Sequence, residues 1–188
     1  MNDLNTANDV QALVAALGQS ARDASRGLIL VGGVSPHFEW DSDAILLQIK
    51  SILARTPDMQ WTLTTSRRTP EDFLARLPAA PRLTVVPHTA TPPDWLPAQL
   101  AQSGTVWVTP DSASMVFEAL TAGADVGVFD LPVNPKSRVG RAVARLAEEL
   151  RKFFMAVDED DRRVHQPGIF DGLVEYRVGV FGTIDGEQ

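Results

Sequence analysis

The segment 109–120 contains the residues best suited to bind a ligand, in a polar turn that leads into a helical pattern. It reads Thr-Pro-Asp-Ser-Ala-Ser-Met-Val-Phe-Glu-Ala-Leu and follows an apolar run at 105–108. Free backbone N–H groups at a helix N-terminus bind anions, so Ser112 and Ser114 are candidate phosphate ligands. Glu118 follows Ser114 by about one helical turn, where its carboxylate can accept hydrogen bonds from sugar hydroxyls. The alternative is that the serines cap the helix and Glu118 faces solvent.

A second polar turn follows the apolar run at 28–31. Gly32 and Gly33 come directly after that run, and Ser35 follows them. Glycine after a buried strand lets the backbone approach a ligand closely, although this turn matches neither the dinucleotide fingerprint nor the P-loop. The two turns together predict one half of a nucleotide-binding site, with Gly32, Gly33 and Ser35 on one side of it.

Several charged residues near these turns have two interpretations. Arg68, and less so Arg67, can reach a diphosphate because arginine pairs bidentately with phosphate, or can pair with nearby surface carboxylates. Asp111 is either a helix N-cap, which we favour, or part of the site, and His37 is either a loop histidine, which we favour, or a general acid or base. Lys136 and Arg138 fit a solvated helix start better than an extension of the anion site.

Composition excludes several other functions. The chain has 188 residues, a net charge of −7, no cysteine and three histidines. One domain is expected, and a general nucleic-acid binder, a thiol enzyme and a zinc site are not. No metal or cofactor is expected. The chain lacks an apolar stretch of about 20 residues and starts without a signal-peptide pattern, so we expect no membrane insertion and a cytoplasmic location.

Strand-like and helix-like segments alternate along the chain. Strands are expected at 28–31, 61–65, 83–86, 105–109 and 126–130, and helices at 7–21, 42–55, 70–77, 95–102, 114–122 and 137–154. This alternation predicts an α/β fold, a Rossmann-like parallel sheet of about five strands in the order 3-2-1-4-5 flanked by helices. In that order strands 28–31 and 105–109 are neighbours, and the two polar turns meet at the point where ligands bind such sheets.

Domain boundaries follow from the same pattern. Residues 1–27 are expected to form an N-terminal helix and linker, and 28–154 the Rossmann-like domain. Residues 155–188 form an acidic tail, in which the alternating segment 173–181 predicts one added strand.

Three blocks of the sequence resemble the bacterial relatives of the plant mitochondrial-fission factor ELM1. They are the Gly32-Gly33 turn with 35–37, the Thr-Ser-Arg-Arg-Thr-Pro block at 65–70, and the 109–120 block followed by Gly123. That family is similar to the two-domain GT-B enzymes, which include glycosyltransferases and sugar-nucleotide 2-epimerases. The resemblance implies that this chain is a single GT-B-like half-domain of the C-terminal, nucleotide-binding type.

The resemblance also implies roles for particular residues. By position, Gly32, Gly33 and Ser114 hold a diphosphate and Glu118 holds the ribose. The expected partner is a nucleotide-sugar or nucleoside diphosphate. Glycosyltransferase-like or epimerase-like activity would then require a second half, from a homodimer or a separate N-terminal half-domain, and no catalytic residue is assigned. The alternative from another class is a non-catalytic interaction or scaffold protein of the ELM1-like family.

Overall fold

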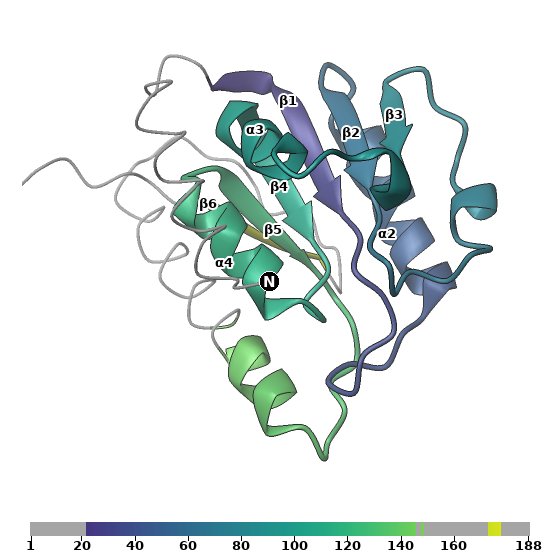
Figure 1. Ribbon diagram of the computed structural model, residues 1–188, viewed down its shortest axis with the longest axis vertical. Helices are drawn as coiled ribbons and strands as arrows, with labels where there is room; N and C mark the ends of the chain where they lie inside the picture. The colour runs from purple at the N-terminus through teal and green to yellow at the C-terminus, as the bar shows by residue number, and fades with distance from the viewer. Residues whose placement is uncertain (1–21, 146–147, 149–172, 178–188) are drawn as a thin grey trace, which may run out of the picture.

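The computed structural model describes residues 22–145, 148 and 173–177. These residues contain one six-stranded sheet and the helices that pack on it (Figure 1). Its strands are β1 (Asp23–Leu30), β2 (Gln60–Thr64), β3 (Leu83–Val86), β4 (Ser103–Val108), β5 (Asp125–Phe129) and β6 (Leu173–Arg177). They lie in the order β3-β2-β1-β4-β5-β6. The five parallel strands confirm the predicted order 3-2-1-4-5 and the predicted α/β Rossmann-like class.

Strand β1 lies at the centre of the sheet, between β2 and β4. Leu30 of β1 pairs with Thr64 of β2 and with Val108 of β4, and both pairings are parallel. The prediction that β1 lies beside β4 in parallel is therefore confirmed. Because parallel strands end at the same edge, the loops that follow β2, β1 and β4 begin side by side.

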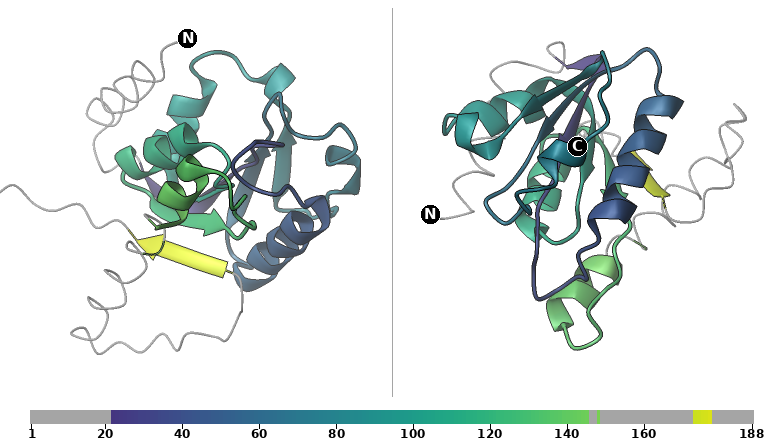
Figure 2. Two further views of the ribbon diagram at one scale, coloured as in Figure 1. Left: turned by 90° about the horizontal axis from the view of Figure 1, so that it is seen from below. Right: turned by 90° about the vertical axis from the view of Figure 1, so that its right-hand side faces the viewer.

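The sheet is covered on both faces, which explains why its central strands are apolar throughout. Ile29 packs in a buried cluster with α2 (Ser42–Arg55), whereas Leu28 packs in a second cluster with α3 (Trp95–Gln102) and α4 (Ala113–Thr121). Successive side chains of a strand point to opposite faces, so adjacent residues of β1 belong to different clusters. Figure 2 shows α2 on one side of the sheet and α3 and α4 on the other.

Two helix ends follow the signals in the sequence. The Asp41 carboxylate caps α2 by accepting hydrogen bonds from the backbone N–H groups of Asp43 and Ala44, at 2.9 and 3.1 Å. Gly123 follows α4 with a φ of 73°, a left-handed conformation that glycine adopts without strain. A further helix begins at residue 138 and is described to 145.

The predicted helix at 70–77 is wrong. This segment forms turns and the short 3-10 helix η2 (Leu74–Arg76), which ends as the chain turns extended at Leu77. Pro78 explains the end, since a residue before proline avoids the helical region. Between β3 and α3 there is a second 3-10 helix, η3 (His88–Ala90).

The added strand β6 extends the sheet beyond β5. It pairs antiparallel to β5, with Leu173 opposite Phe129, and lies in the segment where the sequence predicts an added strand. The predicted helix at 7–21 lies outside the described residues, as does most of the tail 155–188. No helix among the described residues is long and apolar enough to cross a membrane.

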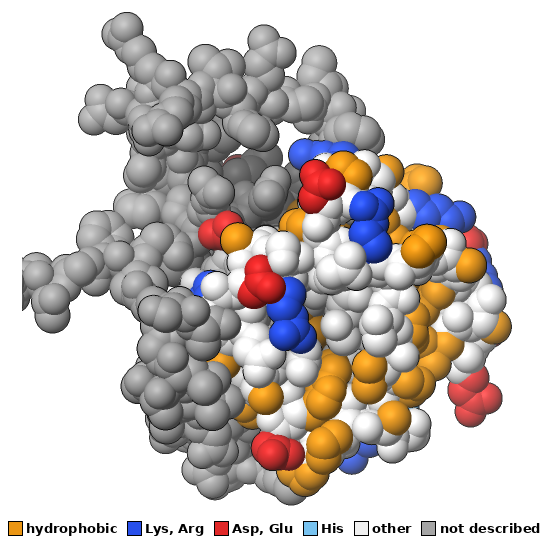
Figure 3. Space-filling view, turned by 90° about the horizontal axis from the view of Figure 1, so that it is seen from above, with side chains coloured by type: hydrophobic (Ala, Val, Ile, Leu, Met, Phe, Trp, Pro, Cys, Tyr) orange, Lys and Arg blue, Asp and Glu red, His pale blue; other side chains and the backbone are white. Residues whose placement is uncertain are grey.

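Figure 3 shows the molecule from the end opposite the carboxyl ends of the parallel strands. On that face, Lys and Arg side chains lie beside Asp and Glu side chains, and hydrophobic side chains are interspersed with polar ones. Charges of both signs are mixed there, so this end does not present the single-sign surface that attracts a polyanion.

Two buried tryptophans pack across glycines on neighbouring strands. Trp61 pairs in register with Gly27, and Trp107 pairs with Gly127. A Cβ atom on Gly127 would come within 2.5 Å of the Trp107 indole. The indole also contacts Phe129 edge to face, at 5.7 Å between ring centroids. Glycine at these strand positions therefore provides the room for the largest side chains of the sheet.

This packing predicts that Gly127→Val destabilises the protein. The added side chain must displace the Trp107 indole, and overpacking of a filled core costs about 1–3 kcal/mol of unfolding free energy. Urea denaturation followed by circular dichroism measures the loss. Thr84→Val is the matched control, because Thr84 is an exposed residue of β3. Equal stability of the two variants would show that Trp107 does not depend on this glycine.

Candidate functional site

Three polar loops meet at the carboxyl ends of β2, β1 and β4. The left panel of Figure 2 looks toward this edge. The Gly32 N–H donates to the Thr109 hydroxyl at 2.7 Å, and the Ser66 hydroxyl donates to the Gly32 carbonyl at 2.9 Å. The Thr69 hydroxyl also donates to that carbonyl. The structure thus brings together the Gly turn, the 66–69 block and the 109–114 turn, as the sheet order predicts.

The two glycines accommodate the protein's own atoms at close range. A Cβ atom on Gly32 would lie 2.2 Å from Oδ2 of Asp111, and one on Gly33 would lie 2.1 Å from the backbone carbonyl of Arg68. Val34 donates its N–H to that same carbonyl at 3.2 Å. In this structure, the atoms that approach the two glycines closely belong to Asp111 and Arg68 of the neighbouring loops.

Asp111 lies at the centre of the three loops. Its Oδ2 accepts a hydrogen bond from the Gly33 N–H at 3.0 Å and an ion-paired hydrogen bond from Arg68 at 2.9 Å. Its side chain is 1% exposed. Its other oxygen, Oδ1, is buried and has no hydrogen-bond partner in the part of the chain that the structure describes. The interpretation of Asp111 as a helix cap is wrong, because Ser112 holds the N-cap position of α4.

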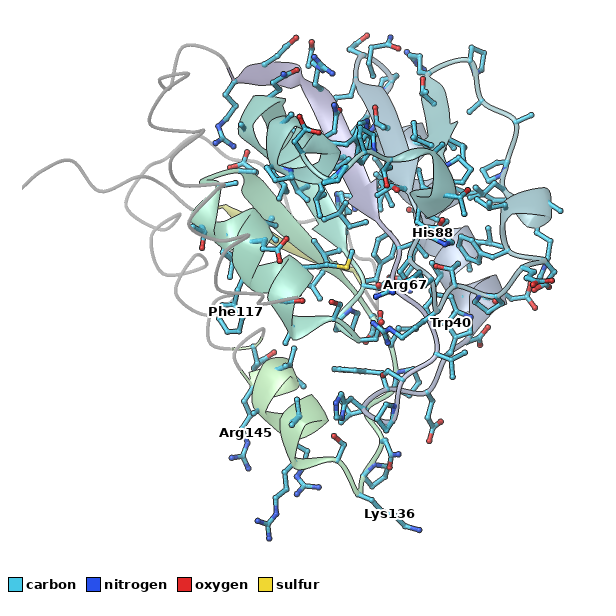
Figure 4. All side chains as sticks on the ribbon, viewed as in Figure 1. Trp40, Arg67, His88, Phe117, Lys136 and Arg145 are labelled. Atoms are coloured by element: carbon cyan, nitrogen blue, oxygen red, sulfur yellow. The ribbon has the colours of Figure 1, made fainter. Side chains whose placement is uncertain are left out.

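Arg68 points toward the site. Its guanidinium donates to the Val34 carbonyl at 3.1 Å as well as to Asp111, and its side chain is 43% exposed. The orientation toward the Gly turn fits the sequence prediction, and pairing with Glu71 or Asp72 does not occur. Contact of Arg68 with a diphosphate stays a prediction. Arg67 is exposed, and Figure 4 shows it near the end of β1 and the start of α4.

The N-terminus of α4 differs from that of α2. In the described structure the Ser112 side chain accepts no hydrogen bond from the α4 backbone, and the Ser112 and Ser114 hydroxyls lie 3.2 Å apart instead. The first-turn N–H groups of α4 are therefore without the side-chain cap that Asp41 gives to α2. An uncapped helix start attracts negative charge through its N–H groups and the helix dipole.

Glu118 is buried, with 7% of its surface exposed. The alternative that it lies on a solvated helix face is therefore wrong. Glu118 is the sixth residue of α4, and it already makes a polar interaction within the protein. Phe117 beside it is 52% exposed and points away from the sheet in Figure 4. A ribose contact by Glu118 stays a prediction.

Other residues singled out in the sequence serve their own loops. The Ser35 hydroxyl accepts from the His37 N–H at 3.2 Å, so it belongs to a local turn. The His37 ring nitrogen Nδ1 lies 2.8 Å from the Ser137 hydroxyl, as fits a loop histidine. Lys136 is exposed and projects away from the strand ends in Figure 4. Whether Ser35 contacts a ligand stays a prediction.

The groups that meet around Asp111 have binding chemistry, and the described hydroxyl–histidine pairs, Ser137 with His37 at 2.8 Å and Thr65 with His88 at 3.5 Å, are not assigned a catalytic role. The groups of the site are backbone N–H donors, hydroxyls, one guanidinium and one buried carboxylate. Residues 22–145, 148 and 173–177 include no group of three histidines or carboxylates that could hold a metal ion.

Sequence reasoning weighed Asp111 as part of the site but favoured a helix cap, and it assigned no role to the hydroxyls of Ser66 and Thr69. Their only signal was that both blocks follow strands predicted to end at one edge.

These features define an α/β protein whose polar site lies where the strand order of a parallel sheet reverses. The family model described as Mitochondrial fission ELM1 matches residues 2–163, which is most of the chain. The chain therefore belongs to the mitochondrial fission ELM1 family.

No curated protein matches the chain. Among solved structures, the chain is similar to KpsC of Thermosulfurimonas dismutans, described as a beta Kdo 2,4 transferase, with 14% identity and a TM-score of 0.41. The match covers 73% of this chain and 48% of that one, so this chain spans about half the length of that structure.

The contacts of the two glycines predict unequal effects on stability. Gly33→Ala collides with the backbone of Arg68 and should lower the unfolding free energy by about 1–3 kcal/mol or more. For Gly32→Ala the three nearest atoms all belong to the Asp111 side chain rather than to backbone, so it should cost less. Chemical denaturation gives both values.

A double-mutant cycle tests the cause. In an Asp111→Ala background the Gly32→Ala change should become nearly neutral, while Gly33→Ala should keep its full effect, because neighbouring residues couple and separate ones add. An unchanged cost of Gly32→Ala in that background would contradict the contact between Gly32 and Asp111.

The burial of Glu118 predicts that Glu118→Ala lowers stability. Removing one partner of a buried polar interaction costs about 1–3 kcal/mol, because the other partner loses its hydrogen bond. The denaturation midpoint in urea measures this, with Phe117→Ala as the exposed control on the same helix. If Glu118→Ala leaves the midpoint unchanged, the interaction of Glu118 contributes nothing to the fold.

Proposed function

We propose that the carboxyl edge of the sheet binds a nucleoside diphosphate or a nucleotide-sugar. One observation carries this proposal, namely the convergence of three polar loops at the switch point beside an uncapped helix start. Open α/β sheets bind their ligands at this position. The sequence blocks that resemble the ELM1 relatives, a family similar to nucleotide-sugar enzymes, are the same three loops.

The phosphates are assigned to the start of α4. Its first-turn N–H groups and the hydroxyls of Ser112 and Ser114 are suited to an anion. Arg67 and Arg68 supply positive charge at the same edge, and the guanidinium of Arg68 is partly open to solvent. Glu118 is buried and already interacts within the protein. The groups suited to phosphate therefore support the proposal more strongly than Glu118, the group suited to ribose, does.

Catalysis would require more than this sheet. No catalytic residue is assigned in the described site, and GT-B chemistry takes place between two half-domains. We therefore propose glycosyltransferase-like or epimerase-like activity only together with a second half-domain, from another copy of the chain or a separate partner. Val34, directly after the Gly turn, is 58% exposed and would face such a partner.

A scaffold function is the second candidate, and one observation favours it. The Gly33 N–H and the Arg68 guanidinium already bind the Asp111 carboxylate, so part of the predicted ligand site is filled by the protein. A fold that keeps this edge closed would serve protein interaction, as the resemblance to the fission factor suggests.

A thermal-shift screen against UDP-, GDP-, ADP- and CMP-sugars separates the two candidates. A bound ligand at about 100 times its dissociation constant should stabilise the protein by about 2.7 kcal/mol. Calorimetric titration then gives the affinity, and Ser114→Ala should weaken it about tenfold, since a hydrogen bond to a charged group contributes roughly 1.5–3 kcal/mol.

Ser51→Ala in the middle of α2 is the matched control and should bind as the wild type does. Stabilisation by none of the nucleotides would favour the scaffold candidate. Binding that Ser114→Ala does not change would place the ligand away from the start of α4.

A further inference from the structure

We propose that the Asp111 carboxylate is an internal competitor of any phosphate group that enters the carboxyl-edge site. It occupies the anion position between the Gly33 N–H and the Arg68 guanidinium, and so limits how tightly the wild-type protein binds anions. The inference deepens the proposed function and rests on it for the identity of the ligand. The contacts of Asp111 with the Gly33 N–H and with Arg68 are observed in the structure and do not depend on that function.

The carboxylate has the contacts of a bound anion. Oδ2 accepts from a backbone N–H of a glycine turn at 3.0 Å and from a guanidinium at 2.9 Å. Backbone N–H groups and arginine are also the groups with which proteins hold phosphate. Gly32 completes the position, because a side chain there would overlap both oxygens of the carboxylate.

The Asp111 carboxylate is not fully satisfied where it lies. Its side chain is 1% exposed, and Oδ1 has no hydrogen-bond partner among the described residues. A buried polar atom without a partner carries a desolvation penalty that water or another donor would relieve. The structure therefore holds this carboxylate at a cost, as expected for a group that excludes something from the position.

Arg68 is the group for which the two anions compete. Its side chain is 43% exposed, so solvent reaches it while it pairs with Asp111. A phosphate that draws Arg68 toward itself weakens the ion pair and leaves a buried carboxylate poorly compensated. A phosphate that enters the turn must instead displace the carboxylate from the Gly33 N–H. Both routes lower the affinity of the wild-type protein.

Titration calorimetry with inorganic pyrophosphate and with UDP tests the competition. Asp111→Ala should bind each ligand at least tenfold more tightly than the wild type, because the released Gly33 N–H and Arg68 can then bind the added anion. Asp111→Asn removes the charge but keeps the volume, so its gain should be smaller. The double variant Asp111→Ala with Arg68→Ala should lose most of the gain.

Asp43→Ala is the matched control. It removes one carboxylate that pairs with an arginine, Arg76, but is 84% exposed and belongs to α2. It should change affinity little, which separates a local effect from the change in net charge. Circular dichroism shows which variants are folded, and Asp111→Asn carries the test if Asp111→Ala does not fold.

The outcomes distinguish the two proposals. If the wild type binds and the folded Asp111 variants bind no more tightly, the competition is wrong and the proposed function stands. If only the Asp111 variants bind, the competition is supported and nucleotide binding by the natural protein is wrong. If no protein binds pyrophosphate or UDP, the competition is overturned, and the proposed function is decided separately by the screen of the four nucleotide-sugars. A gain that persists without Arg68 would also overturn the competition.

Discussion

The Asp111 carboxylate is the point at which three loops from three neighbouring strands are joined. It accepts from the Gly33 N–H after β1 and from Arg68 after β2, while it lies directly before α4, which follows β4. The neighbouring contacts follow from this arrangement. A buried carboxylate needs donors, so the Gly turn and the arginine must approach it, and that approach leaves no room for a side chain at Gly32.

The parallel sheet makes such a junction possible. Because β2, β1 and β4 are adjacent and parallel, their polar loops begin at one edge and face one another. The hydroxyls of Ser66, Thr69 and Thr109 satisfy backbone groups of the Gly turn that strand pairing no longer reaches. Small hydroxyl residues suit this place because they supply hydrogen bonds without filling the space between the loops.

The sequence was informative where local pattern determines structure. Short apolar runs separated by helical segments allow few topologies, since crossovers between parallel strands are right-handed and sequential strands tend to be neighbours. The strand order and the meeting of the two turns could therefore be predicted. The helix at 70–77 was predicted wrongly because Thr69-Pro70 has the pattern of a helix start, whereas Pro78 ends the segment after one 3-10 turn.

The directions of individual polar side chains could not be predicted in the same way. Asp111 before a helix has the local signature of a cap, and only the packing of the Gly turn against it makes it the centre of a buried junction. Glu118 likewise fits a solvated helix face in the sequence, but the tertiary structure around α4 buries it. The error at Asp111 comes from applying a local rule to a residue whose partners, Gly33 and Arg68, are distant in the sequence.

A closed polar junction and a binding site are two states of the same set of groups. Under the proposed competition, the two donors that hold Asp111, the Gly33 N–H and the Arg68 guanidinium, would bind an entering phosphate only to the extent that it interacts better with them than the carboxylate does. A ligand shifts such an equilibrium by its difference in affinity between the two states and by no more than that. The carboxylate is already in place and costs no translational entropy to bring there, which gives it an advantage over any free anion. Whether this edge of the fold acts as a receptor or as a fixed surface therefore depends on the balance between one carboxylate and one guanidinium.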